Sequence, residues 1–180
     1  MSGSLFYDVG KLDQIAINLF YGWGYNFYRL ENQLRADDLL IREKACWLLS
    51  QSRTMIEAAQ SAYRRRYLPL PSRARPLPDP ESVAAAQSLE ALSTSIGQLE
   101  GIIRSLPMPE TDRMTQRYRQ EAQTLMTLGE CDQRLVGLAE ILRQTLEGKD
   151  HDWILTNLAD MQEGIALMMI RVRERQSLLK

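Results

Sequence analysis

The feature that most constrains this chain is an apolar stripe with helical spacing and prolines on both sides. Its members follow one another at steps of three or four positions: Ala85, Leu89, Leu92, Ile96, Leu99, Ile103 and Leu106. This spacing places all of them on one side of an α-helix. Pro78 and Pro80 precede the stripe, and Pro107 follows it. Because proline interrupts a helix, the pattern predicts one helix between these prolines that buries a single face.

Three further stripes predict three more long helices. The last helix carries Ile154, Leu158, Met161, Ile165, Met168 and Val172, with Asp150 or Asp152 as its N-cap. The helix before it starts near Thr111 or Asp112, carries Met114, Tyr118, Leu125, Leu128, Leu135, Leu138 and Leu142, and is closed by Gly148. A helix from about 25 to 67 repeats every seven residues through Phe27, Leu34, Ile41, Leu48, Met55 and Ala62. At about 60 Å it would be longer than a compact domain needs, so we expect it to kink or project.

These stripes indicate an all-α fold in a single domain, residues 1–180. A shorter helix is expected at about 9–21, and no segment shows the alternation of a half-buried strand. The connection 68–80 contains five prolines and must be extended. We therefore predict an antiparallel helical bundle of four long helices plus a short N-terminal helix, with a proline-rich crossover after the first long helix.

Composition excludes several classes of protein. The net charge of -1 gives no overall attraction to nucleic acid or to anionic lipid. No apolar run is long enough to span a bilayer, and no signal peptide is indicated, so we expect no membrane partner. Cys46 and Cys131 lack metal-ligand spacing and are expected to be core thiols, which fits a cytoplasmic protein.

The sequence offers little material for catalysis or cofactor binding. His151 is the only histidine and is expected at a solvated helix N-terminus rather than in a metal site. No phosphate loop, nucleophile motif or metal motif occurs, so neither an enzyme nor a cofactor is expected. Asp38 and Asp132 fall between apolar seam positions. Such carboxylates either fix helix register or mark a polar pocket.

The segment FYGWGYNFYRL, residues 20–30, is the densest aromatic stretch. Gly22 and Gly24 favour a bend there, because each glycine weakens a helix by about 1 kcal/mol. Three interpretations stay open: a buried helix corner, an exposed binding patch, or insertion at a membrane surface. The residues that a binding patch would use are Phe20, Tyr21, Trp23, Tyr25, Phe27 and Tyr28.

Arginines gather at the end of the first long helix and in the connection that follows. They are Arg64, Arg65, Arg66, Arg73 and Arg75, and a second group, Arg171, Arg173 and Arg175, ends the last helix. Cations at a helix C-terminus complement its dipole, so solvated helix ends are one interpretation. Guanidinium groups also suit phosphate or an acidic protein partner through bidentate contacts.

We therefore predict a non-catalytic protein-interaction module, such as an adaptor, assembly factor or regulatory subunit. The aromatic corner would anchor an unidentified protein partner, and the arginines would guide it electrostatically. Self-association into a homo-oligomer is also expected, since the long helix offers more seam than one bundle covers. Two alternatives remain: a planar or apolar ligand held in the core, and nucleic-acid binding through the arginine-rich helix ends.

Overall fold

The computed structural model describes residues 34–73, 76–106 and 122–178. These residues are mostly helical, and within them no β-strand occurs. The helices are α2 (Leu34–Tyr67), α3 (Pro80–Ser105), α5 (Ala122–Leu146), α6 (His151–Thr156) and α7 (Leu158–Leu178). The all-α prediction is thus confirmed for this part of the chain. The expected short N-terminal helix, and the expected long-helix residues before Leu34, lie outside the described residues.

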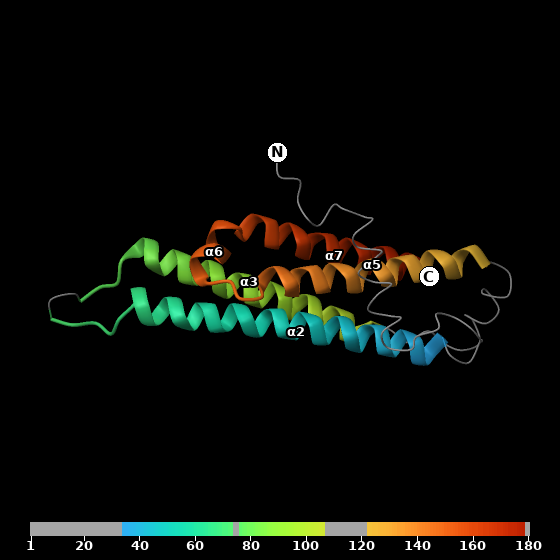
Figure 1. Ribbon diagram of the computed structural model, residues 1–180, viewed down its shortest axis with the longest axis horizontal. Coiled ribbons are helices and arrows are strands. Elements are labelled where there is room, and N and C mark those ends of the chain that lie inside the picture. Colours follow the sequence, from blue (N-terminus) through green and yellow to red (C-terminus); the bar gives the residue numbers. More distant parts are fainter. Residues whose placement is uncertain (1–33, 74–75, 107–121, 179–180) are drawn as a thin grey trace.

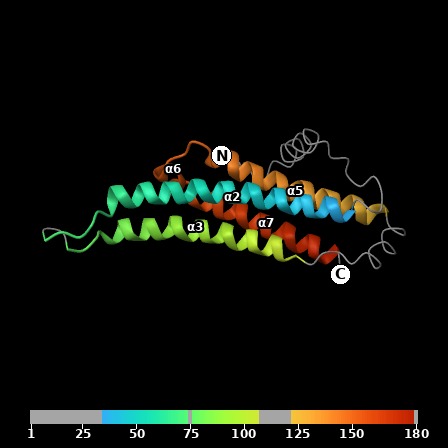
Figure 2. The same ribbon diagram turned by 90° about the horizontal axis from the view of Figure 1, so that it is seen from below.

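The long helices run side by side along one axis (Figures 1 and 2). α2 packs against α3 and α5, and α7 packs against the same two helices from the other side. Helices that are consecutive among α2, α3, α5 and α7 run in opposite directions (Figure 1). However, α2 and α5 run in the same direction, and so do α3 and α7 (Figure 1). The two antiparallel pairs α2/α3 and α5/α7 therefore meet through parallel contacts.

The predicted stripe of α3 forms part of the hydrophobic core. Leu89, Leu92, Ile96 and Leu99 are buried, and so are Ile103 and Leu106 at its end. The helix begins at Pro80, whose missing N–H is not needed in the first turn. Asp79 caps this end by accepting hydrogen bonds from the backbone N–H and the hydroxyl of Ser82, at 2.9 and 2.8 Å.

Helix α2 buries two stripes, whereas the sevenfold repeat predicts one. Ile41 and Leu48 are buried as expected, but Met55 is only partly buried. Along the same helix Leu49 and Ile56 are buried instead. The physical reason is that α2 lies between α3 and α5, so two of its sides are removed from water. The 34 described residues of α2 form one uninterrupted helix of about 50 Å.

The last predicted helix is divided in two. α6 ends at Thr156 and α7 begins at Leu158, with Asn157 between them at φ −105° and ψ 21°. The Asn157 side chain donates to the carbonyl oxygen of Trp153 at 2.8 Å. An asparagine amide that bonds nearby backbone in this way competes with helical hydrogen bonding. The predicted N-cap is confirmed, because Asp150 accepts from the N–H of Trp153 at 2.9 Å.

Two buried carboxylates of α5 are paired, one with a side chain of another helix and one with side chains of α5 itself. Asp132 of α5 is fully buried and accepts from Nε of Arg175 in α7 at 2.6 Å. Glu140 of α5, also buried, accepts from Nε and Nη2 of Arg143 at 2.9 and 2.8 Å. Burial raises the pKa of Glu140, but the hydrogen bonds from Arg143 and Gln144 and nearby positive charge lower it further, to below its ordinary value.

Both predicted core thiols are confirmed: Cys46 and Cys131 are buried and not paired in a disulfide. The turn after α5 places Gly148 at φ 70°, a conformation that glycine adopts without strain, as its predicted role in closing the helix requires. Within the described residues, none of the helices combines the length and the apolar character needed to cross a membrane.

Candidate binding surface at the proline-rich end

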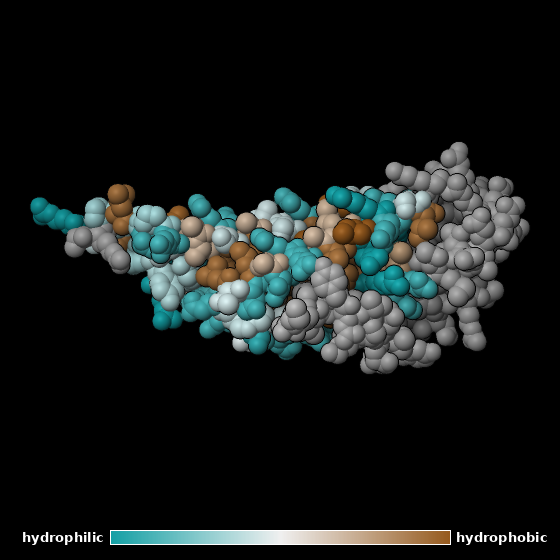
Figure 3. Space-filling model, turned by 90° about the horizontal axis from the view of Figure 1, so that it is seen from above, coloured by the Kyte–Doolittle hydropathy of each residue, from teal (hydrophilic) through white to brown (hydrophobic). Residues whose placement is uncertain are grey.

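The connection between α2 and α3 forms one tip of the molecule (Figure 1). Two leucines stand out from it: Leu70 keeps 92% of its surface exposed and Leu77 keeps 78%. Leu70 lies between Pro69 and Pro71, and Leu77 between Pro76 and Pro78. Each proline fixes its own φ and restricts the residue before it, so the leucines are held on a stiff, extended backbone. Hydrophobic side chains stand among hydrophilic ones at this tip (Figure 3).

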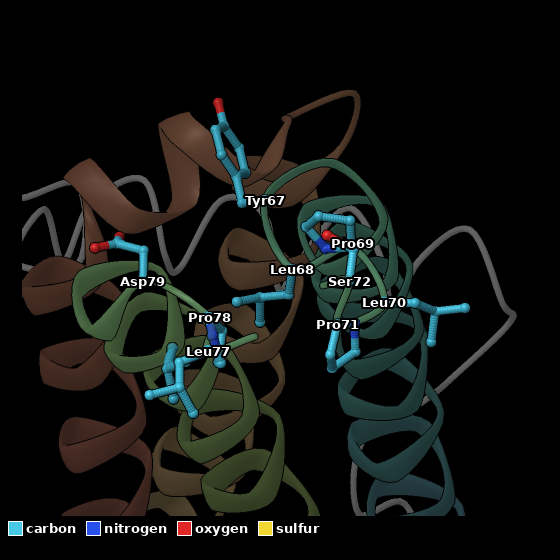
Figure 4. Close-up of a pocket in the computed structure, with 10 residues that line it drawn as sticks. Tyr67, Leu68, Pro69, Leu70, Pro71, Ser72, Leu77, Pro78 and Asp79 are labelled. Carbon is cyan, nitrogen blue, oxygen red and sulfur yellow. The ribbon is translucent and has the colours of Figure 1, made fainter. Parts of the chain in front are cut away.

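A hollow of about 510 Å³ lies between the two arms of this connection. Leu68 and Pro71 on one arm lie opposite Leu77 and Pro78 on the other, whereas Leu70 points outward (Figure 4). Val83 of α3 and Tyr67 also line the hollow, with the ring of Tyr67 pointing away from the side chains of the two arms (Figure 4). Volumes of this size suit a few side chains of a partner or a small ligand. We call this hollow together with Leu70 the loop-end surface.

Three arginines in the last turn of α2 precede the loop-end surface in the chain, and Arg73 lies within the connection. Arg64 donates from Nη2 to Glu90 of α3 at 2.8 Å, which ties α2 to α3. Arg66 lies over the ring of Tyr67, 5.1 Å from its centroid. Arg65 and Arg73 are exposed. The three last-turn arginines complement the C-terminal dipole of α2, and together with Arg73 they also put positive charge beside the apolar tip.

A ring cluster supports the loop-end surface from below. Tyr63 and Tyr67 lie one turn apart with centroids 4.6 Å from each other. The ring of His151 meets both edge to face, at 5.3 and 5.7 Å, and its Nδ1 lies 2.9 Å from the carboxylate of Asp152. Such edge-to-face contacts between rings are favourable. The cluster thus ties the end of α2 to the start of α6.

The expectation that His151 is solvated was wrong. His151 does begin a helix, α6, but its side chain is buried. The physical reason is that Tyr63 and Tyr67 cover the ring, and both tyrosines are more than eighty positions away in sequence. In the part of the chain that the structure describes, no group of three or more His, Cys, Asp or Glu side chains is placed to hold a metal ion.

Four of the five arginines in one predicted binding group lie within the described residues. Arg64, Arg65, Arg66 and Arg73 share the loop end, whereas Arg75 lies outside the described residues. The aromatic group, Phe20, Tyr21, Trp23, Tyr25, Phe27 and Tyr28, also lies outside them, so its role stays a prediction.

Sequence reasoning missed the apolar part of the loop-end surface. Leu70 and Leu77 carry a usable signal, because a leucine between two prolines in an extended connection has no helix face on which to be buried. The pairing of His151 with Tyr63 and Tyr67 carries no such signal, since it depends on how α6 meets α2.

The methionines of α7 are packed with other core side chains. Met161 and Met168 are buried in the cluster formed by the leucines and isoleucines of the four long helices, and Met169 is partly buried against it. Methionine fills ordinary cores in this way.

Comparison with known proteins gave no match: no family model fits the chain, and no curated protein or solved structure is significantly similar to it. The function therefore has to be inferred from the residues of this chain.

Proposed function

We propose that this chain is a non-catalytic protein-interaction module, and that it binds an acidic, partly apolar segment of another protein at the loop-end surface. The observation that carries this proposal is the exposure of Leu70 and Leu77 on a backbone stiffened by prolines, beside an apolar hollow. Exposed apolar groups of this kind, rimmed by polar residues, are typical of protein-binding surfaces.

The physical rationale combines a low entropy cost with charge. A connection already fixed by prolines loses little freedom when a partner binds, so more of the contact energy is retained. The apolar side chains of the partner would enter the hollow and cover Leu70 and Leu77. Arg65, Arg66 and Arg73 would attract its carboxylates, which raises the association rate and selects against basic partners.

The helices would serve as the rigid support of this surface. We infer that α2, α3, α5 and α7 form one bundle and a single domain. In it α2 and α7 each contact both α3 and α5. The Arg64–Glu90 pair and the ring cluster fix both arms of the connection to that bundle. The free thiols fit a cytoplasmic location, and the aromatic segment 20–30 remains the candidate for a second anchor or for self-association.

Site-specific photo-crosslinking in lysate of the host organism tests the proposal. A photoreactive phenylalanine analogue is placed at position 70, at position 77, or at position 170 of α7, where Ile170 is also an exposed apolar residue. We expect positions 70 and 77, but not 170, to capture the same acidic protein segment. Capture should fall about tenfold or more when Arg65, Arg66 and Arg73 are replaced by glutamine, and should survive the control Arg173→Gln.

Other outcomes would refute the proposal. If positions 70 and 170 capture the same proteins, the loop end has no special role. If capture is lost after nuclease treatment and falls steeply with salt, the arginines bind nucleic acid and the alternative is correct. Arg65, Arg66 and Arg73 are exposed, so their replacement should leave the fold intact, and circular dichroism of each variant checks this.

A further inference from the structure

A second hollow lies on the side of the molecule, between α2 and the C-terminal end of α3. Its volume is about 440 Å³, within the range of small-ligand sites. An indole, a thiol, a hydroxyl, a carboxylate and two guanidinium groups line it: Arg42, Glu43, Cys46, Trp47, Ser50 and Arg104. We call it the Trp47 groove. It shares no residue with the lining of the loop-end hollow.

Both arginines of the groove are held in place. Arg42 is buried and donates from Nη1 to the carbonyl oxygen of Leu106 at 2.6 Å. Arg104, which is exposed, pairs through Nη2 with the carboxylate of Glu100 at 2.5 Å. Since a guanidinium group has five N–H donors, the contact with Glu100 leaves Arg104 able to donate to a ligand as well.

The positive charges of Arg104 and Arg42 both act on the Cys46 thiol, which lines the same hollow. Burial raises the pKa of the Cys46 thiol above its ordinary value of 9.0, and the hydrogen bond and charge of Arg104 with the charge of Arg42 offset this only in part. The thiol therefore stays neutral at pH 7 and does not cancel the positive charge. Both arginines also suit the dipole at the end of α3, but a dipole does not explain the aromatic wall beside them.

That wall is Trp47, whose side chain is half exposed at 50%. The Nζ of Lys44 lies over its ring, 4.0 Å from the centroid, and this cation–π contact favours the observed ring orientation. Tryptophan and arginine are the residues most enriched where binding energy is concentrated. A fixed indole beside two fixed cations is suited to a ligand that is both flat and anionic.

We propose that the Trp47 groove binds a small aromatic carboxylate. The ring of the ligand lies against Trp47, its carboxylate accepts hydrogen bonds from Arg104, and Arg42 supplies fixed positive charge at the floor. Among the residues that the structure describes, Glu43 at the rim and Glu100, which competes for Arg104, oppose the anion. Glu43 therefore limits the affinity for the anion, and replacing it with a neutral residue should raise that affinity.

The test is a titration of the full chain with sodium benzoate and with neutral benzamide at constant ionic strength. The indole N–H of Trp47 is followed by NMR and assigned by its loss in Trp47→Phe. We expect a saturable shift with benzoate and at least about tenfold weaker binding of benzamide, because only benzoate carries the charge. Arg104→Gln should lower the affinity for benzoate about tenfold, and Glu43→Gln should raise it at least about twofold. The control Arg173→Gln should leave this affinity unchanged.

Three results would overturn the proposal. Equal binding of benzoate and benzamide would show that charge plays no part. Unchanged benzoate binding in Arg104→Gln, with the fold intact by circular dichroism, would remove the predicted contact. Inorganic phosphate producing the same shift at the same concentrations would show a site for any anion, without recognition of the aromatic ring.

Discussion

Two helices of this protein end in closely spaced arginines, and the structure uses them differently. In α7 the Arg175 side chain is only 3% exposed and pairs with the buried carboxylate of Asp132 at 2.6 Å. In α2 the Arg64 side chain is about half exposed and pairs with an equally exposed Glu90 at 2.8 Å. The two contacts have similar lengths but opposite surroundings.

The contribution of an arginine near a helix end therefore depends on whether its carboxylate partner is buried or exposed. A buried pair has given up its hydration, so each member becomes costly once the other is removed. An exposed pair stays hydrated, so either member can be removed at little cost or recruited by a partner protein. Arg175 at the end of α7 is therefore structural, whereas Arg64 at the end of α2 stays hydrated.

The largest expected effect comes from breaking the buried pair. Arg175→Met leaves the charge of Asp132 buried without this partner, and we expect the free energy of unfolding to fall by about 3–5 kcal/mol. Urea unfolding followed by circular dichroism measures this. The control is the double variant Asp132→Leu with Arg175→Met, which removes both charges and should recover most of the loss. A loss below about 1 kcal/mol in the single variant would mean that the Arg175–Asp132 pair stabilises the fold no more than an exposed pair does.

A second test uses pH on the interior carboxylate Glu140. Its pKa is lowered in the folded protein from the ordinary value of 4.5, so its contribution to stability is present above pH 4.5 and is lost as the pH falls through its folded pKa. Hydrogen bonds to such a charged group contribute roughly 1.5–3 kcal/mol. Between pH 7 and 2.5, the free energy of unfolding should therefore fall less for Glu140→Gln than for the natural chain. Parallel curves would show that Glu140 is not the titrating group.

The sequence predicts which side of a single helix is apolar, but it does not predict how deeply these polar groups are buried. The stripe of α3 was predicted from Ala85 to Leu106, because periodicity reports directly which side of a helix is apolar. It is buried from Leu89 onward, whereas Ala85 is only partly buried. The division at Asn157 and the second stripe of α2 were not predicted. Both depend on neighbours: α2 gains a second buried side from α5, and local periodicity cannot reveal which helix will lie there.

The candidate site shows the same limit. Arg64 to Arg66 could be placed at a helix end from the sequence alone, and the structure keeps them there. By contrast, the grouping of Arg175 with solvated arginines was wrong, because Asp132 lies opposite it on another helix. Charge runs are visible in a sequence, but the distance of each charge from water is a property of the assembled helices.

A smaller effect is expected for the exposed pair. Arg64→Gln should lower the free energy of unfolding by about 0.2–1 kcal/mol, since both side chains remain in water. A double-mutant cycle with Glu90→Gln gives the coupling between the two groups. Coupling above about 2 kcal/mol would mean that the α2 end is as structural as the α7 end.

The smallest effect is expected at the tip itself. Replacing Leu70 and Leu77 by serine should change thermal and urea stability by no more than about 0.5 kcal/mol, because these side chains contribute little to the core. Ile165→Ser on α7, which removes a buried side chain, is the contrasting control and should be strongly destabilising. Equal losses in both variants would show that the leucines support the fold rather than a partner.

The parallel contact between α2 and α5 has a consequence for the order of folding. Hydrogen bonds between α2 and the α3 segment join residues 26 to 64 positions apart, from Arg64–Glu90 to Arg42–Leu106. The approach of Lys44 to Glu140 instead closes a loop on the order of a hundred residues long. Chain closure on that scale is slow, so we expect α2 and α3 to pair first and α5 to dock later. Pulse-labelled hydrogen exchange during refolding would then protect α2 and α3 before α5, and the loop-end surface would exist before the rest of the core.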